Sequence, residues 1–183
     1  MPAHFDRSTA VTALDLLGLG PLNLELAQRW LDLWQGEKLP SRGALNPTQL
    51  VKFLPGLAVL EIHPDDSVRY RIAGTALRAA YGFDPSRRDG MELTPPVHRA
   101  ARLRRFKEFV AGTVGSSIRL VKRPGEVDIV AQDLVLPLGG VSEDGARAWI
   151  FHTSWRPGGA DTLRALPSAA VGMADEYVKH SLR

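Results

Sequence analysis

The chain of 183 residues contains no cysteine. This absence excludes disulfide bonds, thiolate nucleophiles and cysteine-ligated metals, and it fits the reducing cytoplasm in which we expect the protein. The sequence also lacks an apolar run of about 18 residues, so we expect no membrane-spanning helix. Its N-terminus has no basic segment followed by an apolar one, so we expect no secretory signal. The net charge of +3 is small and does not by itself indicate a nucleic-acid partner.

The composition is that of an ordinary globular protein. Apolar residues make up 44% and charged residues 23%, and a chain of this length can bury a real core. We expect one domain with an extension at each end. The predicted divisions are an N-terminal arm at 1–19, a domain at 20–157 and a C-terminal tail at 158–183. The arm is expected to be loose, and Ser168 begins a candidate helix in the tail.

The chain is organised around residues 67–84, which are predicted to form a strand followed directly by a short helix. Apolar residues alternate with basic or small ones along the strand, which gives it one apolar face. Gly74 ends the strand, and Thr75 can cap the helix because its hydroxyl can accept a hydrogen bond from an unpaired helix N–H. Gly82 is placed to end the helix.

Residues 21–35 predict a helix with Pro21 in its tolerated first turn. At about 100° per residue its polar residues fall on one narrow stripe, and apolar residues cover the rest. So wide an apolar arc exceeds what one sheet face needs, so we expect the helix also to contact a second copy of the chain. The alternative is a helix buried between its own sheet and the N-terminal arm. The predicted dimer-interface residues are Leu22, Leu26, Trp30, Leu33 and Trp34.

The remaining segments indicate the α+β class with an antiparallel sheet. The run 57–62 is apolar at nearly every position, which suits a strand covered on both faces. The turn at 63–66 joins it to the next strand in a hairpin, and the last three strands follow one another as a meander. Strands are predicted at 57–62, 67–73, 116–123, 126–136 and 146–155, and helices at 47–53 and 97–111.

Several short pieces of sequence punctuate this order of elements. The most specific is the run from Arg69 to Thr75, Arg-Tyr-Arg-Ile-Ala-Gly-Thr. The other pieces are Trp30 and Trp34, Leu39-Pro40-Ser41-Arg42, Asn46-Pro47, Leu54-Pro55, Tyr81-Gly82, Gly90 and Pro137-Leu138. Together, over residues 20–157, they resemble a PAS domain, and more closely the small stand-alone PAS-like proteins of bacteria.

The resemblance implies a five-stranded antiparallel sheet cupped by short helices and preceded by an amphipathic N-terminal helix. It also implies a cavity between sheet and helices, frequent dimers through the N-terminal helix, and a role in sensing or signalling. The usual kinase or cyclase output domain is not found in this sequence. The output is therefore expected to pass through contacts with another protein, which the sequence does not identify.

The candidate ligand-binding residues are aromatic, basic and histidine side chains expected beside that cavity. His152 lies in the last strand, on the face opposite Trp149 and Phe151, and could bond a ligand, although a satisfied core or edge histidine is the stronger alternative. Arg99 and Arg102 would suit a carboxylate or phosphate through bidentate hydrogen bonds, unless their stems only cover apolar surface while the charged heads reach water. The aromatic candidates are Tyr70, Trp149 and Phe151.

The sequence does not identify a cofactor. His98 begins the helix at 97–111 and could be a haem ligand, but no other haem signal accompanies it. Flavin photochemistry through a cysteine adduct is excluded, and non-covalent flavin has no support in the sequence. The basic residues of this helix lack a helix-turn-helix context, so we expect no nucleic-acid partner, and no metal motif is present.

An enzyme is the weakest of the functional interpretations. His152 and Ser154 share a strand face, while Asp128 and Asp133 lie on opposite faces of the neighbouring strand. No nucleophile elbow or phosphate loop is present, so we predict no catalytic residue. The sequence thus favours a dimeric PAS-like sensor or adaptor that binds a small apolar or amphipathic molecule. The alternatives are a ligand-free protein-interaction module and a small hydrolase using His152 and Ser154.

Overall fold

The computed structural model describes residues 5–121, 127, 129–157 and 178–182. The α-helices in this part of the chain are α1 (Arg7–Asp15), α2 (Pro21–Asp32), α3 (Thr75–Tyr81) and α4 (Pro96–Val110). Short 3-10 helices are η1 (Arg42–Ala44), η2 (Pro47–Leu50), η3 (Leu54–Gly56) and η4 (Pro85–Arg87). The strands are β1 (Leu57–Ile62), β2 (Val68–Ala73), β3 (Thr113–Val121), β4 (Ile129–Pro137), β5 (Arg147–Pro157) and β6 (Val178–Ser181).

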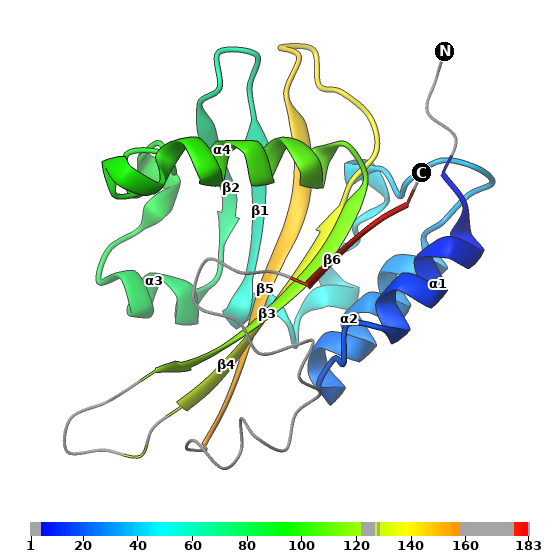
Figure 1. Cartoon of the computed structure of the whole chain (residues 1–183), viewed down its shortest axis with the longest axis horizontal. Helices are drawn as coiled ribbons and strands as arrows, with labels where there is room; N and C mark the ends of the chain where they lie inside the picture. The colour runs from blue at the N-terminus through cyan, green and yellow to red at the C-terminus, as the bar shows by residue number, and fades with distance from the viewer. Residues whose placement is uncertain (1–4, 122–126, 128, 158–177, 183) are drawn as a thin grey trace.

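The strands form one antiparallel sheet in the order β2-β1-β5-β4-β3-β6. β1 and β2 are the predicted hairpin, β3 to β5 are the predicted meander, and β5 pairs with β1 to join the two (Figure 1). The α+β class and the antiparallel sheet are therefore confirmed. The sheet has one strand more than predicted, because residues 178–181 of the tail pair with β3. The candidate helix at Ser168 lies outside the described residues.

β1 is the strand on which the two layers of the protein meet. All of its residues are buried, as predicted for a strand covered on both faces. Leu57 and Val59 contact one hydrophobic cluster, whereas Ala58 and Leu60 contact the other. This follows from the strand geometry, in which successive side chains point to opposite faces of the sheet.

The helices begin and end close to their predicted positions. α2 begins at Pro21 and ends at Asp32, three residues before the predicted end. α3 ends at Gly82, whose left-handed φ of 74° suits a residue without a side chain. The predicted cap by Thr75 is wrong, because the N-cap residue is Gly74 and no side chain caps α3.

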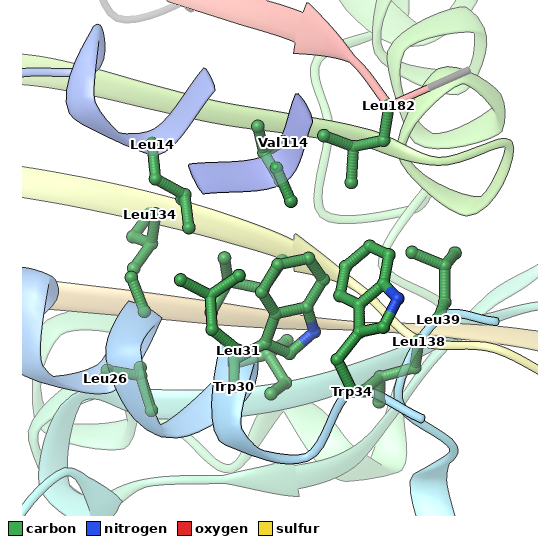
Figure 2. Close-up of a cluster of buried hydrophobic side chains, with 14 of the residues drawn as sticks. Leu14, Leu26, Trp30, Leu31, Trp34, Leu39, Val114, Leu134, Leu138 and Leu182 are labelled. Carbon is green, nitrogen blue, oxygen red and sulfur yellow. The ribbon is translucent and has the colours of Figure 1, made fainter. Parts of the chain in front are cut away.

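α1 and α2 cover one face of the sheet and enclose the larger hydrophobic cluster (Figures 1 and 2). Trp30 is 1% exposed and Trp34 is 8% exposed. Their rings meet edge to face at 5.0 Å, and Trp30 Nε1 donates a hydrogen bond to Pro137 O at 2.9 Å. The indole of Trp30 therefore has its polar atom satisfied inside the core, as a buried tryptophan requires.

The N-terminal arm is not loose over the residues of α1, contrary to expectation. The side chain of Asp6 accepts hydrogen bonds from the backbone N–H groups of Ser8 and Thr9 and so caps the helix. Ala10 and Leu14 are buried against the sheet-facing cluster. Burial of this apolar stripe, rather than helix propensity alone, explains why so short a helix is held in place.

This packing changes the interpretation of the predicted dimer interface. Leu26, Trp30 and Trp34 are buried within their own chain, so they are not available to a second copy. For these three residues the structure agrees with the alternative, a helix between its sheet and the N-terminal segment. Leu22 is 37% exposed and Leu33 is half-buried, so these two remain on the surface of α2.

α3 and α4 cover the opposite face of the sheet, and α4 crosses the strands at an angle (Figure 1). Leu77 of α3 and Phe109 of α4 are buried there against β1, β2 and β5. The outer side of α4 is exposed, with Val97 as its most exposed apolar side chain at 82%. Among the described residues, no helix has the length and apolar character that crossing a bilayer requires.

Replacing the core tryptophan provides a direct test of this arrangement. We expect Trp30→Ala to lower the free energy of unfolding by about 3–5 kcal/mol, because it leaves a large cavity and removes the bond to Pro137. Leu24→Ala, on the exposed side of the same helix, should change it by less than about 1 kcal/mol. Urea denaturation followed by fluorescence measures both. Equal losses in the two variants would contradict the packing of α2.

Candidate functional site

The aromatic candidates lie together on the sheet face that α3 and α4 cover. Tyr70 of β2 and Trp149 of β5 both pair with Leu60, one on each side of β1. Phe151 pairs with Ala58, two residues along β1 and on the same face. The predicted trio thus lies on β2 and β5, the two strands that flank β1. Trp149 is fully buried, whereas Tyr70 and Phe151 are half-buried.

α4 places two further aromatic rings over this face. The ring centroids of Phe106 and Trp149 are 4.9 Å apart, and those of Phe109 and Trp149 are 6.4 Å apart. Both separations are typical of aromatic side chains in direct contact. Neither phenylalanine was among the ligand-binding residues predicted from the sequence. Their spacing of three positions along α4 is what brings both onto Trp149.

The two arginine candidates bind the start of their own helix. Arg99 Nε donates to Thr94 O at 3.0 Å, and Arg102 Nη1 donates to Thr94 Oγ1 at 3.1 Å. The guanidinium carbon of Arg102 also lies over the Phe106 ring, 5.7 Å from its centroid. These contacts hold the loop before α4 against the helix. Arg99 is exposed and Arg102 is half-buried.

A buried polar cluster on the same sheet face was missed by the sequence analysis. Asp133 of β4 is paired in register with Ser117 of β3 and Thr153 of β5. Its carboxylate accepts hydrogen bonds from Ser117 Oγ at 3.1 Å and Thr153 Oγ1 at 2.7 Å. All three side chains are buried. A polar residue within an apolar strand was the available signal, but only the pairing of three strands shows the cluster.

His152, the last candidate, lies on the other face of the sheet, beneath α2. Its Nδ1 is 2.6 Å from Asn23 Oδ1, and its ring meets that of Phe53 edge to face at 5.8 Å. Asn23 Nδ2 in turn donates to Gln132 O at 3.1 Å. His152 is therefore a buried histidine with hydrogen-bond partners in the core, which was the alternative considered from sequence. It is separated from the aromatic trio by the sheet.

With this arrangement described, the chain can be compared with known proteins. A sequence profile described as a PAS domain matches residues 21–148. The chain belongs to the PAS domain family. A search of curated proteins returns no match. Among solved structures, the crystal structure of a Rhodobacter sphaeroides LOV protein is similar, with 11% identity over 64% of this chain and 72% of that chain, and a TM-score of 0.37.

Membership of this family makes the chain a PAS domain of the general sensory type. The resemblance stated from the sequence is confirmed. The matched residues run from the start of α2 into β5 and include both helices that cover the aromatic face.

Two clefts are described on the surface of this PAS domain, and both border the α1–α2 side of the sheet. One lies between α2 and η2, is lined by residues such as Leu33 and Leu50, and has a volume of about 20 Å³, which is room for one water molecule. The other has a volume of about 220 Å³ and lies between η1 and the β4–β5 connection. The second cleft alone is large enough for a small metabolite.

Ser154 and His152, the pair named in the hydrolase alternative, contact different partners. Ser154 Oγ is 3.4 Å from Gln132 O, and the His152 ring is bonded to Asn23 and the backbone of Phe53. A nucleophile needs its base within hydrogen-bond reach, and neither of these contacts joins the two side chains. Within the described part of the chain, no group of three or more histidine or acidic residues is arranged to hold a metal.

Burial changes the protonation behaviour of His152. Loss of solvent lowers the pKa of His152 to about 4 from its usual 6.5, although the hydrogen bond with the Phe53 backbone opposes this shift. The imidazole is therefore neutral in the folded protein near pH 7. The unfolded chain binds a proton at this residue below about pH 6.5, whereas the folded chain does so only below about pH 4.

This difference predicts an acid sensitivity that depends on one residue. Because the unfolded state binds more protons between pH 6.5 and 4, the free energy of unfolding should fall by up to about 3 kcal/mol across that range. His152→Gln keeps a hydrogen-bonding side chain but cannot titrate, so its unfolding free energy should fall less. His98→Gln, at an exposed histidine, should behave as wild type. Identical pH profiles for His152→Gln and wild type, measured by urea denaturation, would refute this assignment.

Proposed function

We propose that this PAS domain is a sensor that binds a small apolar or amphipathic molecule between the sheet and the α3–α4 layer. The observation that carries the proposal is the convergence of aromatic rings from β2, β5 and α4 on one sheet face. Aromatic side chains with a few polar groups are the usual lining of small-molecule sites. The buried cluster around Asp133 supplies polar groups on that same face.

The half-buried rings are the ones that a ligand would contact. Tyr70, Phe106 and Phe151 are each partly exposed, whereas Trp149 and Phe109 are fully buried. A ligand that displaces water from the partly exposed rings gains apolar contact without disrupting the packing of the fully buried rings. Its signal would arise by binding one arrangement of α3 and α4 more tightly than another, because only differential affinity shifts such an equilibrium.

Signalling in this proposal passes through protein contacts, including a homodimer. Support for a dimer comes from the leucines that α2 leaves on its surface. Leu22 and Leu33 are predicted interface residues, and both keep part of their surface exposed. A second copy that covered these side chains would remove apolar area from water, which is the main driving force of association.

Native mass spectrometry and thermal unfolding test the sensor proposal together. We expect extra mass on the purified protein, or a rise of about 5 °C in Tm with an apolar metabolite near saturation. Tyr70→Ala and Phe151→Ala should reduce that shift, and Val97→Ala should not. The same spectra report the oligomeric state, and Leu22→Asp should shift a dimer to monomer. A wild-type protein with neither bound mass nor a shift from any metabolite class would refute ligand sensing.

A ligand-free interaction module is the second candidate function. The observation in its favour is the direct stacking of Phe106 and Phe109 on Trp149, by which the chain's own rings occupy the layer beneath α4. In that case the exposed outer side of α4 would carry the function. This side presents Arg104, and the helix is rich in basic residues along its length. An acidic protein surface is the partner that such a helix suits.

Charge reversal on α4 distinguishes the two candidates. For the interaction module, Arg104→Glu combined with Arg105→Glu should abolish capture of the partner while leaving Tm within about 2 °C. A charge reversal elsewhere, Arg147→Glu on β5, serves as the matched control and should leave capture unchanged. Affinity capture with the purified protein measures the effect. Equal capture by the double variant and wild type would rule out α4 as the interaction surface.

A further inference from the structure

The fully buried strand β1 contains one ionisable residue, Glu61, which is 4% exposed. A buried carboxylate without a partner would cost several kcal/mol, so its surroundings must compensate the charge. Arg42 Nη1 donates to Glu61 Oε1, and Arg71 Nε lies 3.4 Å from Glu61 Oε2. The three residues come from η1, β1 and β2, and the Asp133 cluster and the aromatic rings lie on the other face of the sheet.

Glu61 lies in the larger of the two clefts, which has a volume of about 220 Å³. Residues 41–43 line one side of the cleft and residues 139–142 line the other. Its buried lining residues are Glu61, Ala146 and Ala148. Apart from Arg42 and Val141, the other residues that line the cleft with Glu61 are serine, glycine and alanine, and these small side chains leave space beside its carboxylate.

The two sides of the cleft are joined by backbone contacts. Gly139 N donates to Pro40 O at 2.9 Å, and Ser41 and Gly139 form a parallel bridge. A Cβ atom at Gly139 would lie 2.5 Å from Leu39 O, so this approach requires glycine. The cleft is therefore preformed and needs no closure to bring Arg42 beside Glu61.

The charges around the cleft favour an anion. The side chains of Arg42 and Arg71 are 45% and 60% exposed, so part of each guanidinium group faces solvent while Glu61 is covered. Two arginines and one carboxylate leave a net positive charge. Arg69, opposite Glu61 in register, is also exposed and adds to it. The carboxylate of Asp144, on the nearby turn, lies 3.3 Å from His63 Nδ1 through Oδ2, and its Oδ1 accepts a hydrogen bond from Ser142 Oγ in the cleft lining.

We propose that this cleft binds a small oxyanion, a carboxylate or a phosphate monoester, at Arg42, which lines the cleft, with Arg71 beside Glu61 as a second cation. A guanidinium group presents five N–H donors in a planar fork that matches either anion, and one nitrogen of each arginine contacts Glu61. Glu61 is a positioning residue, because it holds both forks at the cleft. The volume is below the usual range for drug-sized ligands, which limits the ligand to a small metabolite.

The test is a titration of ¹H–¹⁵N amide signals with inorganic phosphate and, separately, with succinate. Sodium chloride is reduced in step, so that ionic strength stays constant and general salt effects cancel. We expect saturable shifts at residues 139–142 with at least one probe. Arg42→Gln and Arg71→Gln should each weaken binding about tenfold, the effect of one charge-assisted hydrogen bond. Arg104→Gln, which removes the same charge from α4, should bind within about twofold of wild type.

Lysine variants distinguish weaker anion binding from loss of folding. Arg42→Lys and Arg71→Lys keep a positive charge beside Glu61, so both should remain folded, but they lose the planar fork and should bind severalfold more weakly. A response to phosphate alone or to succinate alone identifies the chemical class of the ligand. No saturable shift with either probe, equal weakening by Arg104→Gln, or wild-type affinity in both lysine variants would overturn the proposal.

Discussion

The structure depends on a buried polar network that joins the N-terminal helices to the sheet. Asn23 of α2 lies between His152 Nδ1 and the backbone oxygen of Gln132, and the Gln132 side chain bonds Gly18 O and Gly20 N in the turn before α2. Buried polar groups are costly unless they are satisfied, so this network fits one placement of α2 and penalises others. Trp30, which donates to a carbonyl of β4, fixes the far end of the same helix.

Once α2 is placed, the two faces of the sheet acquire different roles. The face beneath α1 and α2 is filled by leucines and tryptophans (Figure 2), and the cleft that contains Glu61 lies at its margin. The opposite face carries the aromatic rings and the Asp133 cluster beneath α3 and α4. The strict alternation of side chains along β1 and β5 separates these two environments by the thickness of one sheet. The two proposed ligand sites therefore lie on opposite faces of the sheet.

The division between the two faces also explains why the predicted site residues do not all lie in one place. Trp149 and Phe151 were named as candidates together with His152, although alternation along the strand already predicted His152 on the opposite face, where the structure has it. The tryptophans of α2 were assigned to a dimer because their helix is apolar over a wide arc. The arc is instead divided between the sheet and α1, as in the alternative of a helix buried between its own sheet and the N-terminal arm. Asn23, Gln132 and Glu61 were overlooked because a single polar residue in an apolar segment has no periodicity.

Local patterns along the chain determined the elements: the alternation at 68–73, the proline at the start of α2, the glycine after α3, and the hairpin and meander order that indicates an antiparallel sheet. These signals depend on residues within a few positions of one another, so they can be recognised in the sequence. Tertiary structure alone decided that the tail adds β6 beside β3, that α1 covers Trp30, and that Arg42 and Arg71 meet at Glu61. Those contacts join residues far apart in the chain, and their energies depend on burial and charge compensation that arise only when the segments pack together.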